Sequence, residues 1–110
     1  MANTFKLKTK ANVGVTTVGI YTAPAATTTV VIGITLSNTS GSGVNVGVAV
    51  SRTSDTQDYV NLLKNAPIPQ GSSLEFMGGN KVVLETNDQI NVDSDTNNSV
   101  DAALTIMEIT

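Results

Sequence analysis

The chain has 110 residues, with 6 Lys or Arg, 9 Asp or Glu, a formal net charge of −3, and no cysteine, histidine or tryptophan. This length suits a single domain, and the missing residue types exclude a thiolate nucleophile, a disulfide, an imidazole base and a zinc site of the usual Cys/His kind. The few basic residues argue against a nucleic-acid surface, and about a third of the chain is Thr, Val or Ile, which favours strands.

The N-terminal segment has the period-two pattern of a strand. Its apolar residues and threonine alternate with three lysines, Lys6, Lys8 and Lys10. We expect the face with Phe5 and Leu7 to lie on the core and the lysine face to lie in solvent. Residues 1–10 are then either an edge strand or an N-terminal arm that reaches a neighbour. The lysines either protect that edge or form a contact patch for an acidic partner.

The next segments predict a core hairpin. Residues 16–21 form a short strand that ends before Pro24, which lacks an amide donor. Residues 29–38 and 44–52 then alternate cleanly. Their inward faces are predicted to consist of aliphatic side chains, namely Val30, Ile32, Ile34 and Leu36 in the first and Val44, Val46, Val48 and Val50 in the second. Because residues 38–43 are rich in Asn, Ser and Gly, we expect the two strands to pair across this loop.

Short strands also account for the second half. Residues 53–57 read as a loop, and residues 58–64 as either a strand or one helical turn, of which we favour the strand. Pro67-Ile68-Pro69 is expected to lie outside any ladder. Residues 73–77 and 81–85 predict a short hairpin around Gly78-Gly79-Asn80.

A turn at Thr86-Asn87-Asp88 leads to a strand at 89–93, and a polar loop precedes the last strand at 100–109. In this last strand, one face is predicted to carry Val100, Ala102, Leu104 and Ile106. The other face carries Asp101, Ala103, Thr105 and Met107.

Strands spaced about every ten residues predict an all-β fold in a single domain, residues 1–110. We expect an antiparallel two-sheet β-sandwich, jelly-roll-like, with about eight strands. A closed barrel is the alternative, since periodicity does not reveal strand order.

Few residues suggest chemistry. Asp93-Ser94-Asp95-Thr96-Asn97 resembles the start of a calcium loop, but Asn98 replaces the required glycine and Leu104 the required carboxylate. A polar loop is therefore the favoured interpretation, and whether Asp93, Asp95 and Asn97 hold a cation stays open. We expect no enzymatic activity and no cofactor. Tyr21 and Tyr59 are instead candidate anchors of a subunit contact, since rigid aromatics are frequent hot spots.

One family resemblance covers most of the chain. It rests on five groups of residues: residues 20–25 with 27–40, residues 59–69, Gly71-Ser72-Ser73-Leu74, Val83-Leu84-Glu85 with Asp88, and the closing Val100-Asp101 with Glu108-Ile109-Thr110. In these spacings the sequence resembles small structural proteins of tailed bacteriophages. It departs from them at Thr86-Asn87, where the family pattern has a small residue and a glycine, so we expect Asn87 to supply the positive φ of that turn.

The resemblance implies a virion structural protein, made in the host cytoplasm, that self-associates. Its partners would be the major capsid protein or neck and tail proteins, with no nucleic acid and no membrane. A capsid decoration or cement protein is the first expectation, with residues 1–10 contacting a neighbour. A neck, tail or fibre component is the alternative, and a host-glycan-binding module is the third, against which the shortage of aromatic residues counts.

Overall fold

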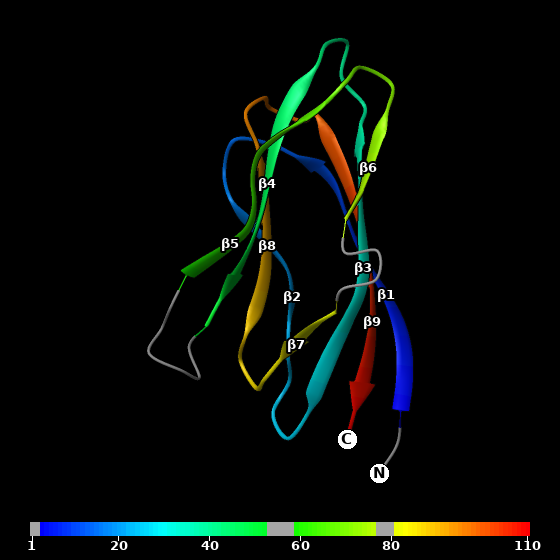
Figure 1. The fold of residues 1–110 in the computed structure, drawn as a ribbon, viewed down its shortest axis with the longest axis vertical. Coiled ribbons are helices and arrows are strands. Elements are labelled where there is room, and N and C mark those ends of the chain that lie inside the picture. The colour runs from blue at the N-terminus through cyan, green and yellow to red at the C-terminus, as the bar shows by residue number, and fades with distance from the viewer. Residues whose placement is uncertain (1–2, 53–58, 77–80) are drawn as a thin grey trace.

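The computed structural model describes residues 3–52, 59–76 and 81–110, and within these ranges the secondary structure consists of strands without a helix. Two antiparallel sheets face each other and enclose the core, so the predicted all-β sandwich is confirmed (Figure 1). The strands are β1 (Asn3–Val13), β2 (Val18–Thr22), β3 (Thr28–Asn38), β4 (Val44–Ser51), β5 (Tyr59–Ile68), β6 (Ser73–Phe76), β7 (Val82–Leu84), β8 (Gln89–Ser94) and β9 (Val100–Ile109).

The strand order is that of interleaved sheets. Sheet A has the order β1-β9-β3-β6, with β7 also paired to β3, and sheet B has the order β2-β8-β4-β5. The chain changes sheet after β1, β2, β3, β5, β7 and β8. If β6 and β7 count as one interrupted strand, eight strands remain and their order is jelly-roll-like.

Alternation correctly predicts the inner faces of β4 and β9. The buried side chains of these two strands include Val44, Val46, Val48, Val50, Val100, Ala102, Leu104 and Ile106. They meet Val31, Ile34, Leu36, Leu84, Ile90 and Val92 in one hydrophobic core. Strands of both sheets therefore place every second residue between the layers, as a sandwich requires.

The predicted pairing of β3 with β4 is wrong, because the two strands lie in different sheets. The loop between them is a corner organised by Asn38, which is buried. Its amide nitrogen donates to the carbonyls of Ser42 and Ile68, at 2.8 and 3.0 Å, and its side-chain oxygen accepts from Ser40. The Asn- and Ser-rich segment thus turns the chain from sheet A to sheet B instead of closing a hairpin.

The inward face of β3 changes phase at a β-bulge. Val31 pairs with Ile106 of β9, whereas Gly33 pairs with Thr105, so Ile32 is an extra residue in β3. Ile34 and Leu36 are buried as predicted, but Val30 and Ile32 are only half-buried, and Val31 is buried in their place. A bulge shifts the side-chain alternation by one residue, which strict periodicity does not anticipate.

The predicted hairpin of β6 and β7 is also wrong. Both strands pair with β3, β6 along residues 34–37 and β7 along residues 29–31, so they follow one another on the same side of β3. The predicted turn at Gly78-Gly79-Asn80 and the predicted loop at 53–57 lie outside the described residues.

Two local predictions concern proline and asparagine. Pro67 lies inside β5 opposite Asn45, contrary to prediction. It is tolerated because β5 is an edge strand, so its missing amide hydrogen removes no ladder bond on the open side.

Asn87 has a φ of 72°, which confirms the predicted left-handed turn residue before β8.

Candidate functional site

The orientation of β1 is the opposite of the predicted one. This strand is the edge of sheet A and pairs antiparallel with β9 from Asn3 to Lys10, the segment for which an arm or an edge strand was left open. Phe5 and Leu7, which were expected on the core, are 68% and 64% exposed. The apolar side chains of β1 therefore lie on the outer face of the sandwich.

The lysines of β1 lie on the inner side. Lys6 Nζ forms an ion pair with Glu108 Oε1 at 2.9 Å, and Glu108 is buried in the neighbouring strand β9. Lys8 Nζ lies 6.0 Å from the centre of the Tyr21 ring. Lys10, further along β1, is exposed.

Tyr21 connects the two sheets through its hydroxyl. It extends from β2 of sheet B and donates to Glu108 Oε2 at 2.6 Å, so it accepts from Thr29 Oγ1 at 2.8 Å. Burial, followed by the hydrogen bond to Glu108, raises the pKa of Tyr21 to about 12. The Tyr21 hydroxyl and then Lys6 hold the pKa of Glu108 below its usual value.

This cluster gives the inward lysines of β1 their partners. Inward-pointing charged residues are one way in which proteins protect an edge strand from pairing with another chain. Lys6 can point inward because Glu108 supplies a charge partner beside Tyr21. A lysine placed outward would leave Glu108 buried without that partner. The inward lysine thus pairs with a buried charge, while Phe5 and Leu7 stay exposed on the outer face.

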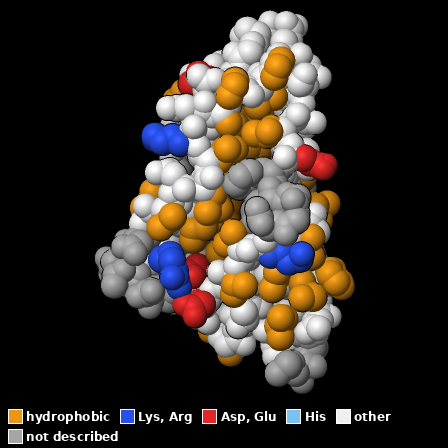
Figure 2. Space-filling model, viewed as in Figure 1, with side chains coloured by type: hydrophobic (Ala, Val, Ile, Leu, Met, Phe, Trp, Pro, Cys, Tyr) orange, Lys and Arg blue, Asp and Glu red, His pale blue; other side chains and the backbone are white. Residues whose placement is uncertain are grey.

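The outer face of sheet A carries a continuous row of apolar side chains. Phe5 lies opposite Met107, Met107 opposite Val30, and Val30 opposite Val83, so the row crosses β1, β9, β3 and β7. Phe5 and Val83 are 68% and 57% exposed, and Met107 and Val30 are half-buried. We call these four residues the outer apolar row. Figure 2 shows hydrophobic side chains gathered at the lower right, where β1, β9 and β3 lie in Figure 1.

The sequence-predicted interface residues do not form one surface. Lys6 and Lys8 lie on the inner side of the edge strand β1, beside the buried Tyr21, and the Lys6 side chain is still 43% exposed. Tyr59 lies on β5 of sheet B and is 53% exposed. Sequence reasoning missed Met107 and Val83 as surface residues, although the alternation in β9 had placed Met107 opposite the core face.

The carboxylates of the calcium-like segment have protein partners. Asp93 Oδ2 accepts from Thr17 Oγ1 at 3.1 Å, and Asp95 Oδ1 accepts from the backbone N–H of Asn45 at 3.1 Å. Within the described ranges, the side chains contain no group of three or more His, Cys, Asp or Glu residues suited to a metal ion. In the same ranges we find no helix with the length and apolar character needed to cross a bilayer.

Comparison with known proteins shows the fold. The sequence matches no protein-family profile and no curated protein. The structure is similar to a chain of the disulfide-linked pili of Bacillus endospore appendages, with a TM-score of 0.59 and 13% identity over 99% of this chain and 87% of that chain. It is also similar to part of a chain of the T13 IBDV viral particle, with a TM-score of 0.59 and 12% identity over 96% of this chain and 30% of that chain. At these identities the likeness concerns the fold alone.

Proposed function

We propose that the chain is a non-enzymatic structural subunit of a virion. More specifically, we propose that it decorates the capsid and contacts copies of itself or the major capsid protein through the outer apolar row. The observation that carries this proposal is the row itself, with Phe5 of β1 68% exposed at one end and Val83 of β7 57% exposed at the other end, on the same face of one sheet. The resemblance to phage structural proteins and the fold shared with a pilus and a viral chain support it.

The energetics favour a contact on the face of sheet A. Fully burying a Phe or Val side chain stabilises by about 1.5–3 kcal/mol, so covering Phe5 and Val83 provides a driving force for association. A row that continues over four strands differs from the scattered apolar residues of an ordinary surface. Because Lys6 and Lys8 protect the open edge of β1, the face of the sheet is the better contact than strand addition at this edge.

Association through this face would be non-covalent. The chain has no cysteine, so a disulfide link of the kind named for the endospore pili cannot form. Such a subunit depends on mass action, and its stability in the particle rises with the number of neighbours that cover it. Polar substitutions in the outer apolar row should therefore weaken the association.

The test compares two variants of the purified chain by light scattering and by incorporation into particles. Phe5→Ser combined with Val83→Ser should remove self-association and incorporation. Val15→Ser is the matched control, because Val15 is 56% exposed but lies outside the outer apolar row. Equal incorporation of both variants would contradict the proposed contact.

Protein stoichiometry of purified particles separates the two virion locations. A copy number comparable to that of the major capsid protein supports a decoration protein. A copy number that fits a single ring would instead indicate a neck, tail or fibre component, the alternative expected from the sequence.

A further inference from the structure

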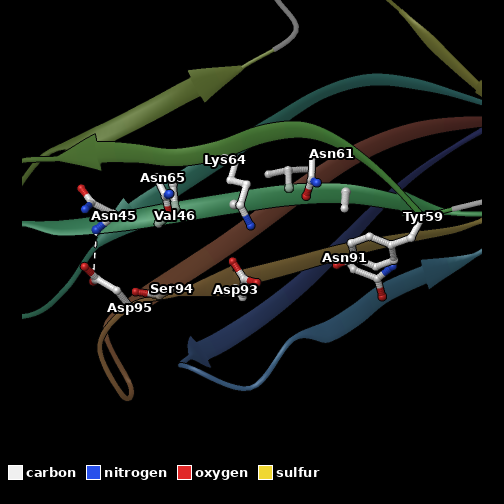
Figure 3. Close-up of a pocket in the computed structure, with 13 residues that line it drawn as sticks. Asn45, Val46, Tyr59, Asn61, Lys64, Asn65, Asn91, Asp93, Ser94 and Asp95 are labelled. Atoms are coloured by element: carbon white, nitrogen blue, oxygen red, sulfur yellow. Dashed lines mark hydrogen bonds between the residues drawn. The ribbon is translucent and has the colours of Figure 1, made fainter.

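A second surface lies on sheet B, on the outer side of the sandwich from the core. The central strand β4 forms its floor, and β5 and β8 form its two walls (Figure 3). The hollow has a volume of about 170 Å³. We call it the polar trough. Its walls carry amide and carboxylate groups, and Tyr59 stands at one end.

Small residues on β4 make the trough possible. Gly47 and Ala49 lie on its floor, where larger side chains would fill the space. A Cβ atom at Gly47 would lie 2.7 Å from Asp93 Oδ1 and 3.4 Å from the carbonyl oxygen of Leu63. The missing side chain of Gly47 thus lets the Asp93 carboxylate lie against the floor, with its other oxygen held by Thr17.

The β5 wall is built from irregular backbone. Its pairing with β4 shifts register twice, between Val46 and Val48 and between Val48 and Ala49. Asn65 has a left-handed φ of 55° at the first of these shifts. Bulges redirect side chains and are frequent beside binding sites. In Figure 3, Asn61 and Lys64 come from this wall, and Lys64 points across the trough toward β8.

Asn91 on the β8 wall points to a ligand. Only 5% of this residue is exposed, yet its side chain makes no hydrogen bond to any residue in the described ranges. A buried amide normally has partners. None of the deeply buried side-chain polar atoms in these ranges is unsatisfied, so the Asn91 amide reaches the trough, which it lines beside Tyr59 (Figure 3). Its donor and acceptor are therefore directed toward whatever occupies the trough.

The lining selects the ligand class. Asn61 and Asn91 can each donate and accept, Asp93 accepts, and Lys64 donates, which matches hydroxyl groups that do both. The ring of Tyr59 is 53% exposed and offers an apolar face at one end. Asp93 and Asp95 on one wall disfavour an anionic ligand, and the volume is below the roughly 300–1,000 Å³ of sites for drug-sized molecules.

We propose that the polar trough binds one ring of a neutral saccharide. The C–H face of the sugar packs on Tyr59, and its hydroxyls bond to Asn91 and Asp93. This function goes beyond the proposed structural role. It does not depend on that role, because the outer apolar row lies on the other sheet.

The test titrates the purified chain with D-glucose, D-galactose, D-mannose and N-acetyl-D-glucosamine. Tyrosine fluorescence is one readout, since the chain has two Tyr and no Trp. The side-chain amide signals of a ¹⁵N spectrum are the other. We expect saturable binding of at least one of these sugars, with a shift of the Asn91 amide signal, and weaker binding of D-glucuronate.

Variants locate the binding. Asn91→Ala and Tyr59→Ala should each weaken the affinity by about tenfold or more. Phe5→Ala is the matched control, an exposed aromatic on the opposite sheet, and should bind as the parent does. Circular dichroism checks that each variant is folded, and because Tyr59 is exposed, its variant keeps the test decisive if Asn91→Ala does not fold.

Three results would overturn the proposal. They are the absence of saturation by all four neutral sugars, equal affinity in the folded Tyr59→Ala variant, and a spectral response to glucuronate as strong as that to the neutral sugars or a response to calcium chloride without sugar. The double variant Phe5→Ser with Val83→Ser should bind sugar as the parent does, whether or not it is incorporated into particles. The two proposals can therefore fail separately.

Discussion

Replacing Tyr21 with phenylalanine tests the polar link between the sheets. The substitution keeps the buried ring and removes the hydroxyl, which donates to Glu108 at 2.6 Å and accepts from Thr29 at 2.8 Å. A hydrogen bond to a charged group contributes about 1.5–3 kcal/mol, so we expect the free energy of unfolding to fall by about 2 kcal/mol at pH 7. The unfolding entropy is about 2.1 cal/mol/K per residue, and dividing the loss by the entropy of the 110-residue chain gives a melting temperature lower by about 9 °C.

Tyr59→Phe is the matched control for this substitution. Tyr59 is 53% exposed, and its hydroxyl makes no hydrogen bond within the described part of the chain. We therefore expect its free energy of unfolding to change by less than about 0.5 kcal/mol. Urea denaturation of both variants measures the difference. Equal losses in the two variants would refute the role given to the Tyr21 hydroxyl.

The loss of unfolding free energy caused by Tyr21→Phe should become smaller both at high pH and at low pH. The pKa of Tyr21 is raised to about 12, so its contribution is complete below the unfolded pKa of about 10 and is lost as pH rises toward 12. The pKa of Glu108 is lowered, so its contribution is complete above the unfolded pKa of about 4.3 and is lost as pH falls below it. The stability difference between parent and variant should therefore be largest between about pH 5 and 10, and a flat difference would contradict this account.

Two further substitutions test local features by urea denaturation. Asp88→Ala should lower the free energy of unfolding by about 1–3 kcal/mol, because the buried carboxylate accepts from Arg52 Nε and from the Glu85 amide. Asp88→Asn keeps an acceptor oxygen and should lose less. Ala26→Gly should raise stability by about 0.5–1 kcal/mol, since Ala26 has a left-handed φ of 56°. The same change at Ala25, which is outside that region, should instead lower stability, and equal effects at both positions would exclude relief of backbone strain.

The sequence by itself determined where most strands lie along the chain and which faces of β4 and β9 lie inside. Alternation is local, so the four valines of β4 predict their own burial whatever strand lies beside them. The turn before β8 was likewise readable, because the left-handed φ of Asn87 is a preference of the residue itself. In the outer apolar row, Met107 was predictable from the same alternation.

Only the tertiary structure decided how the strands pair and which way β1 faces. The loop after β3 would suit a hairpin or a corner, and the contact of Asn38 with the Ile68 carbonyl, 30 residues away, makes it a corner. Phe5 lies on the outer face of the strand whose Lys6 pairs with Glu108, near the other end of the chain. The polar trough likewise needs Gly47 of β4 beside Asp93 of β8. Such long-range contacts arise from folding, and hydrophobic periodicity within one segment carries no information about them.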